Sequence, residues 1–312
     1  MFRFPMPRLA LRLLALTVAI VPMSFETTEA AETAETVLIR QTLDKDRVGR
    51  RRGDVDLIRS AFADRFVTYN GNGFADPVGW SVEHEDPGAY TAALAADLSA
   101  NRYDIVRTVL FLTVLEHMAI GAVVDSGNVV DRSSGVSQPF RDKSLWSFRK
   151  YEDRWLATSV VQALGDSAAG PFQGPPSSHP EIQQFINSDA AKWNDGDAGA
   201  IAGSLDLESR IIDSASKFDP AGWVLLFTGV QEYGDWLDSR MQVVDYELER
   251  KLLHSSVGPG GTEGLAVAHE RLTARHKLGT ATHGIERVVF WTLSKRTGDW
   301  LITNQFANIR RP

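Results

Sequence analysis

The sequence lacks cysteine, so this chain of 312 residues can form no disulfide, no thiolate metal site and no cysteine nucleophile. It also lacks any strongly basic segment, and its formal net charge of −7 argues against nucleic-acid binding. The Gly-x-Ser-x-Gly elbow of serine hydrolases is absent as well. With 43% hydrophobic and 23% charged residues, the composition is that of a globular protein long enough for two domains.

The N-terminus has the pattern of a secretory signal peptide over residues 1–31. Three arginines precede an apolar run at 13–23, and an A-x-A-like segment follows at 28–30. We expect cleavage after Ala30 or Ala31 and a periplasmic or secreted mature chain without a membrane span. The apolar run is too short to cross a bilayer as a helix. A retained N-terminal anchor is the alternative, because the residues around the cleavage site are imperfect for processing.

One stretch that contains two tryptophans occurs twice in the sequence. Residues 145–159 and 290–304 align at a constant offset of 145, so that Trp146 matches Trp291. In each copy, residues of alternating polarity flank a polar turn, which predicts a β-hairpin. Gly298 gives the second turn access to a positive φ.

The order of predicted elements repeats with the same spacing. Two helices, separated by Gly53-Asp54 in the first half and Gly196-Asp197 in the second, precede a short strand, a further helix and four strands. The segment 164–180 is rich in Pro, Gly and Ser and predicts an interdomain linker. We therefore expect an α+β tandem duplication, with domains at 32–163 and 181–312.

This order of elements resembles the NTF2-like, or SnoaL-like, superfamily. The strand Asp64-Arg-Phe-Val67 and the closing pattern Trp-x-x-x-Lys…Asp-x-Trp-Leu carry the resemblance, which covers most of both predicted domains. It implies two cone-shaped domains, each a curved antiparallel sheet wrapped around helices and enclosing an apolar pocket. The superfamily includes dehydratases, ketosteroid isomerases, polyketide cyclases and non-enzymatic binding proteins, so the resemblance leaves the function open.

The resemblance implies that a catalytic member would carry a histidine or carboxylate on the concave sheet face. His117 is the best acid/base candidate, because it continues the apolar face of a strand predicted over 108–118 and its ordinary pKa suits the role. Tyr69 and Asp125 could converge on it. The alternative is a hydrogen-bonded structural histidine. The sequence matches neither the isomerase nor the dehydratase residue pattern, which lowers the case for an enzyme.

Three histidines of the second half lie on predicted strands: His254, His269 and His276. His269 and His276 fall on opposite faces of their strand and therefore cannot ligate one metal ion. We expect no metal site and no cofactor.

The most consistent function is binding of a small apolar molecule in one or both cones. The ligand-binding candidates are Tyr69, Trp80, Phe111 and His117. The alternative is a dehydratase-, isomerase- or cyclase-type enzyme, which would be a cofactor-independent lyase or isomerase with a pocket His or carboxylate as acid/base. We favour binding, because the sequence shows no catalytic constellation.

We further expect the two domains to dock sheet against sheet as an intramolecular pseudo-dimer, in a chain that is monomeric. The strand at 288–293 carries bulky side chains on both faces, and such a sheet needs cover. The linker, as a flexible coil, reaches roughly 20–25 Å, which allows docking.

Overall fold

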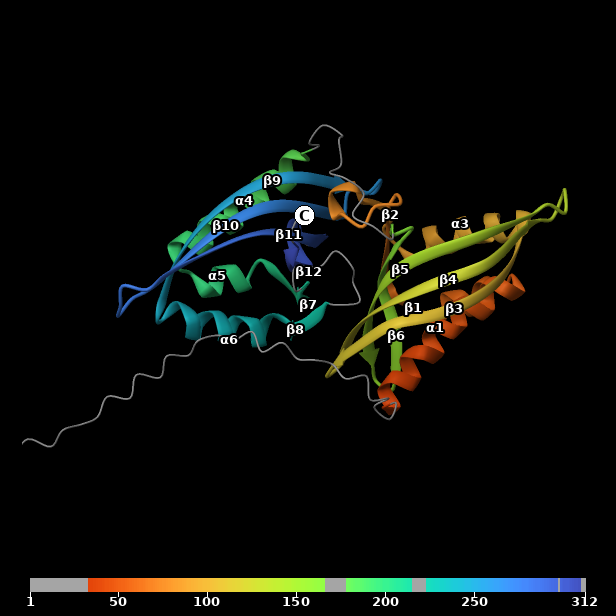
Figure 1. Ribbon diagram of the computed structural model, residues 1–312, viewed down its shortest axis with the longest axis horizontal. Coiled ribbons are helices and arrows are strands. Elements are labelled where there is room, and N and C mark those ends of the chain that lie inside the picture. Colours follow the sequence, from red (N-terminus) through yellow and green to blue (C-terminus); the bar gives the residue numbers. More distant parts are fainter. Residues whose placement is uncertain (1–32, 166–177, 215–222, 297, 310–312) are drawn as a thin grey trace, which may run out of the picture. The chain divides into compact units, whose positions relative to one another are not determined.

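The computed structural model of the protein describes residues 33–165, 178–214, 223–296 and 298–309. The predicted signal peptide and most of the predicted linker lie outside these residues. Residues Ala34–Pro312 belong to one compact unit. Its described part contains two six-stranded sheets that follow one another along the chain, each accompanied by its own helices (Figure 1).

The two halves have the same order of elements. The first half comprises α1 (Ala34–Arg52), α2 (Val55–Arg59), β1 (Phe62–Asn70), the 3-10 helix η1 (Pro77–Gly79), β2 (Ser81–His84), α3 (Pro87–Ala100), β3 (Asn101–Leu115), β4 (Met118–Asp131), β5 (Ser137–Tyr151) and β6 (Arg154–Gln162). The second half comprises α4 (Pro180–Asp195), α5 (Ala198–Ala202), β7 (Leu205–Asp213), β8 (Val224–Thr228), α6 (Val230–Met241), β9 (Val244–Val257), β10 (Glu263–His276), β11 (Thr282–Arg296) and β12 (Asp299–Ile309).

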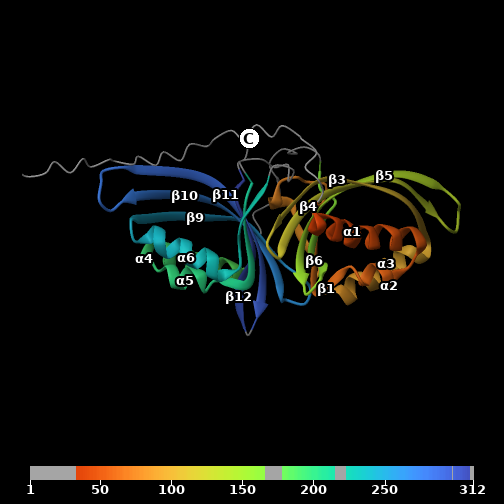
Figure 2. The same cartoon turned by 90° about the horizontal axis from the view of Figure 1, so that it is seen from below.

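The strand order is also the same in both sheets. It is β2-β1-β6-β5-β4-β3 in the first and β8-β7-β12-β11-β10-β9 in the second. Neighbouring strands are antiparallel, except that β1 pairs with β6, and β7 with β12, in parallel. Each sheet curves around the helices of its own half (Figure 2). This is an α+β architecture in two tandem copies, each a curved sheet wrapped around helices, so the predicted fold class is confirmed.

The first two helices of each half are separated by a glycine followed by an aspartate, as the sequence predicts. Gly53 and Gly196 adopt φ values of 69° and 68°, a left-handed conformation that glycine accepts readily. Asp54 then accepts a hydrogen bond from the backbone N–H of Leu57 and caps α2. Asp197 caps α5 in the same way.

Each tryptophan hairpin is tied to the first helix of its own half. In the first half, the Glu35 carboxylate accepts hydrogen bonds from Lys150 Nζ, at 2.6 Å, and from the indole N–H of Trp155. The second half repeats this arrangement with Glu181, Lys295 and Trp300. The duplicated sequence motif therefore encodes a duplicated contact between hairpin and helix.

Each of the two sheets contains one strand more than the sequence pattern predicts. The short strands β2 and β8 extend the sheets beyond β1 and β7. Both are only four or five residues long, which is too short for alternation to be recognised with confidence against a loop.

Apolar side chains form a separate core between sheet and helices in each half. A further apolar cluster combines residues from the opposite faces of the two sheets, including Val67 and Ile120 from the first half and Val267 and Phe306 from the second. Both faces of these strands are therefore buried, one in the cone and the other against the second half.

Candidate functional site

His117 lies in the turn between β3 and β4, not on a strand. Its side chain is 45% exposed and its Nδ1 is 3.7 Å from the Glu116 carboxylate. Glu116 itself adopts a φ of 49°, which reverses the chain. The prediction that His117 continues an apolar strand face is therefore wrong. Asp125 lies eight residues further along the chain, on β4 and roughly 25 Å away at the rise of a strand, so the structure does not bring the two together.

Tyr69, Trp80 and Phe111 do lie in one region, but on the outer face of the first sheet. Tyr69 and Trp80 are 1% exposed and belong to the apolar cluster shared by the two halves, and Phe111 packs against that cluster. The Trp80 ring meets the Phe290 ring edge-on, with centroids 5.0 Å apart. Strand alternation explains the placement, because Phe66 points into the cone and Tyr69, three residues on, points out. These candidates therefore line the contact between halves and not the cone.

The inner face of the first cone holds a buried ion cluster centred on Arg107 of β3. Its guanidinium donates to Asp125 of β4 at 2.7 and 2.5 Å, to Asp46 of α1 at 2.7 Å and to the Leu43 carbonyl oxygen at 2.6 Å. Burial opposes ionisation of Asp46, but the cations Arg50 and Arg107 outweigh it and hold the pKa of Asp46 below its usual value. The cluster is thus a set of ionised groups that satisfy one another.

Arg50 extends this cluster from α1 toward α3 and β6. It donates from Nε to Asp46 and from Nη2 to the Tyr90 hydroxyl, which also accepts a hydrogen bond from Gln162 at 2.7 Å. Burial raises the pKa of Tyr90 to about 12, so the phenol stays neutral at physiological pH. Its proton remains available to a further acceptor.

A cavity of about 170 Å³ opens beside this cluster within the first cone. Its polar wall consists of Arg50, Arg107, Asp125, Asp142, Ser144 and Gln162. Its remaining wall consists of Tyr103, Ile105, Phe140 and Trp146. The cavity thus offers hydrogen-bond donors and acceptors on one side and aromatic surface on the other.

Asp142 of β5 contributes a carboxyl group to the polar wall of the cavity. Burial raises its pKa, and the nearby Asp125 adds to the rise, although the Ala163 N–H donates to Asp142 Oδ1 at 2.9 Å. A carboxyl of this kind can donate a hydrogen bond when neutral and accept one when ionised. Perturbed carboxyls in cavities are candidates for ligand recognition or proton transfer.

The second cone has a related cluster without such a carboxyl. Arg250 of β9 donates to Asp189 at 2.8 Å and to Glu270 at 2.7 Å, and Arg287 of β11 donates to Glu270 at 2.7 Å. The strand registers make Arg287 the counterpart of Asp142, since each pairs with the carboxylate residue of the neighbouring strand. In the second cone, the cation Arg287 therefore occupies the position at which the first cone has the protonatable carboxyl of Asp142.

Sequence reasoning singled out Asp125 but missed Asp46, Arg107 and Asp142. A signal was present in the repeat, because Asp46 and Arg107 each have an identical residue 143 positions later. No comparable signal marks Asp142, whose counterpart is an arginine.

The part of the chain that the structure describes contains neither a metal-binding cluster nor a helix that could span a membrane. No group of three or more His, Asp or Glu side chains there could hold a metal ion. No helix there is long and apolar enough to cross a membrane.

No protein-family model matches the sequence, and no curated protein matches it. Solved structures that are similar to part of the chain include a ketosteroid isomerase-like protein from Erwinia carotovora, at 14% identity and a TM-score of 0.36, which spans 43% of this chain and 98% of that one. An NTF-2 like protein of unknown function from Silicibacter pomeroyi has 14% identity and a TM-score of 0.32, over 41% of this chain and 93% of that one. A second such protein, from Shewanella oneidensis, has 15% identity and a TM-score of 0.30, over 41% and 96%. At these identities, similarity concerns the fold alone and says nothing about activity.

Proposed function

We propose that the first cone binds a small cyclic molecule that carries at least one polar group. The observation that supports this proposal is the cavity of about 170 Å³, in which Arg50 and Asp142 share the lining with the rings of Tyr103 and Trp146. An aromatic wall with a few placed polar groups is the usual composition of a small-molecule site.

The size of the cavity limits the ligand. A protein cavity of about 150 Å³ accommodates benzene, whereas drug-sized ligands occupy roughly 300 Å³ or more. The first cone therefore suits a molecule of about six to ten non-hydrogen atoms. A steroid or a long acyl chain would not fit.

The chemistry of the wall modifies the expectation of an apolar ligand. A wholly apolar molecule would remove water from the Asp142 carboxyl and the Arg50 guanidinium without replacing its hydrogen bonds, which is unfavourable. A hydroxylated or carbonyl-bearing ring would satisfy these groups and still cover the aromatic wall. Phenols and small cyclic ketones are therefore the ligand class that we propose.

The test is a thermal-shift and calorimetric screen of the full chain with phenol, catechol, cyclohexanone, benzene and a steroid. We expect the polar rings to raise the melting temperature and the steroid to have no effect. Ile105→Phe, which fills the cavity, should abolish the shift. His117→Ala should preserve it, because His117 lies in an exposed turn. Ligand effects that survive Ile105→Phe, or no effect from any polar ring, would contradict the proposal.

A second candidate is acid–base catalysis in the same cavity. The observation in its favour is Asp142, a carboxyl whose pKa burial raises and which shares a cavity with two arginines. If the protein turns over its ligand, Asp142→Asn should abolish turnover while ligand binding and stability persist. Equal loss of binding and turnover would leave binding as the function.

The proposal also includes the compartment and the assembly of the chain. The N-terminal pattern supports export to the periplasm or secretion, and the apolar cluster shared by the two halves supports a monomeric pseudo-dimer. N-terminal sequencing of the protein from cell fractions should find a chain that begins near residue 31 outside the cytoplasm. Light scattering should give the mass of one chain. An intact N-terminus would favour the retained anchor, and a dimer mass would contradict the monomer.

A further inference from the structure

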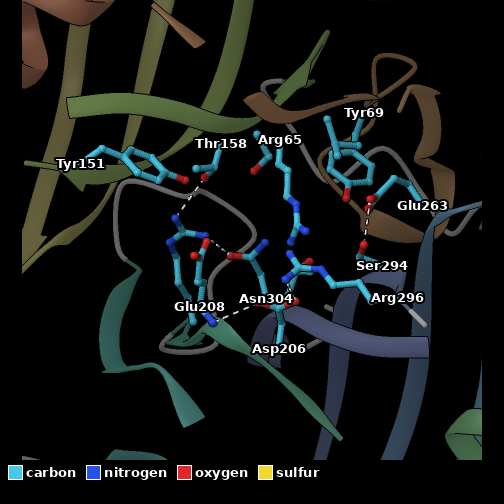
Figure 3. A pocket seen from close by; sticks show the side chains of 14 residues that line it. Arg65, Tyr69, Tyr151, Thr158, Asp206, Glu208, Glu263, Ser294, Arg296 and Asn304 are labelled. Carbon is cyan, nitrogen blue, oxygen red and sulfur yellow. Dashed lines mark hydrogen bonds and ion pairs between the residues drawn. The ribbon is translucent and has the colours of Figure 1, made fainter. Parts of the chain in front are cut away.

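A second, smaller cavity of about 60 Å³ lies where β1 and β6 of the first half approach β7, β11 and β12 of the second. Its lining includes six charged side chains: Arg65, Asp206, Glu208, Arg210, Glu263 and Arg296. Figure 3 shows Arg65, Asp206, Asn304 and Arg296 converging on it from both halves. Of its lining residues the sequence singled out only Tyr69, as a candidate for the cone, and none of the charged ones.

Arg210 of β7 is the unusual member of this group. Arg210 is only 4% exposed. Its guanidinium donates to Asn304 Oδ1 at 3.2 Å, to Thr158 Oγ1 at 3.0 Å and to the Phe148 carbonyl oxygen at 3.1 Å. All three acceptors are neutral, and Arg210 Nε has no hydrogen-bond partner among the described residues. Burial lowers the pKa of Arg210 to about 10.

Two carboxylates of the lining are already engaged by other arginines. Glu208 forms an ion pair with Arg149, and Asp206 forms one with Arg296 at 2.5 Å. Arg107 and Arg250, the buried arginines of the two cones, are each held by two carboxylates. Arg210 thus lacks the counter-charge that both other buried arginines have.

We propose that this cavity is a binding site for a small monovalent anion, such as a halide or a short carboxylate, with Arg210 as its principal donor. A buried cation without a paired anion is unfavourable, and an anion beside the unpartnered Nε would supply the missing charge and the missing acceptor. The volume supports this size class, because one water molecule takes about 30 Å³ of liquid. Two to four heavy atoms therefore fit, whereas a sugar or nucleotide does not.

Glu263 makes the site dependent on pH. Burial raises the pKa of Glu263 to about 7, and the nearby Glu85 and Asp206 add to the rise, while a hydrogen bond from Ser294 and the charge of Arg296 oppose it. Tyr69 also lines the cavity, but burial keeps its pKa far above this range. Below about pH 7, Glu263 is neutral and does not compete with the bound anion. Above it, its carboxylate supplies negative charge to the same cavity and weakens anion binding.

The test measures the melting temperature of the full chain against sodium chloride and sodium acetate at pH 6 and pH 8. Ionic strength is held constant with sodium gluconate, whose anion is too large for the cavity. We expect saturable stabilisation by chloride or acetate at pH 6 and several-fold weaker binding at pH 8. If chloride saturates at the lower concentration, the natural ligand class is a halide; if acetate does, it is a carboxylate. Equal effects of chloride, acetate and gluconate would overturn the proposal.

Three variants make the test specific to this cavity. Arg210→Met should abolish the anion effect, and Glu263→Gln should make it equal at pH 6 and pH 8. Arg65→Gln, at an exposed position of the same wall, should weaken it, which keeps the proposal testable if Arg210→Met does not fold. Arg271→Met, at a 61% exposed side chain of the second sheet, is the matched control and should leave it unchanged. An anion effect that persists in both Arg210→Met and Arg65→Gln would also overturn the proposal.

Discussion

Arg107 and Arg250 stand 143 positions apart in the chain and occupy the same place in two successive cones. Each guanidinium lies over a tryptophan ring, Arg107 at 5.4 Å from the Trp146 centroid and Arg250 at 4.7 Å from that of Trp291. Each is bonded to one carboxylate from the first helix of its half and one from the neighbouring strand. The cluster is thus common to both cones, and the difference between them resides in Asp142 and its counterpart Arg287.

The first prediction concerns the stability of the second cluster. Arg250→Met should lower the free energy of unfolding by about 3–5 kcal/mol, because it leaves Asp189 and Glu270 buried with one cation fewer. Arg271→Met is the matched control and should change stability by about 0.5 kcal/mol or less, since its ion pairs are exposed. Urea unfolding followed by circular dichroism measures both. Similar losses in the two variants would show that burial does not distinguish these pairs.

Local sequence signals predicted the parts of the fold that depend on local chemistry. Gly53 and Gly196 end the first helices with positive φ, and Gly298 turns the second hairpin with a φ of 97°, as their positions in the pattern indicate. The repeated tryptophans marked the duplication because each is fixed by a contact within its own half.

The candidate site was harder to predict, for two physical reasons. The reversal at Glu116 uses a non-glycine residue with positive φ, so no turn signal interrupts the alternation that leads to His117. Alternation also cannot say which face of a strand lies inside a cone when both faces are apolar, as at Phe66 and Tyr69. Asp142 was missed because a single carboxylate on a strand is indistinguishable from a solvated one until its neighbours are known.

The second prediction concerns the hydroxyl of Tyr90. Tyr90→Phe should lower the free energy of unfolding by about 1–2 kcal/mol, because Arg50 and Gln162 both lose their buried acceptor. It should also weaken binding of a polar ring in the first cone, since the two freed donors border the cavity. Thermal unfolding and calorimetric titration measure these effects. Tyr246→Phe in the second half is the control for removal of a tyrosine hydroxyl and should leave ligand binding unchanged.

The third prediction concerns the contact between the two halves. Phe290→Ala should cost about 3–5 kcal/mol, because the ring is fully buried and packs against both Trp80 and Phe306. Differential scanning calorimetry should show one transition for the wild-type chain, since the halves share an apolar cluster. The variant should show two separated transitions. Val106→Ala, at a 63% exposed position on β3, should keep the single transition. A single transition at the wild-type temperature in Phe290→Ala would mean that the shared cluster does not couple the halves.

The last prediction is a dependence of stability on pH that arises from Glu263. Its pKa is about 7 in the folded chain against an ordinary value of 4.5, so between these values the folded state binds more protons than the unfolded state. Stability from this residue is therefore complete below about pH 4.5 and is lost as the pH rises through about 7. The loss should be on the order of 3 kcal/mol, and Glu263→Gln should remove it.

Urea unfolding between pH 4 and pH 8 in gluconate buffers, without small anions, measures this profile. Glu249→Gln is the control, because Glu249 is 70% exposed on the neighbouring strand β9 and should leave the wild-type slope intact.

A second measurement follows the contact between the two halves beside Glu263, which lies in the cavity between them. There the Glu85 carboxylate accepts hydrogen bonds from the backbone N–H groups of Gly260, Thr262 and Glu263, and the stability of this contact should fall with rising pH in the same way. Hydrogen exchange of those amides should be slower at pH 5 than at pH 8 after correction for the intrinsic rate. Exchange that is independent of pH after that correction, together with an unchanged slope in Glu263→Gln, would place the buried proton on another group.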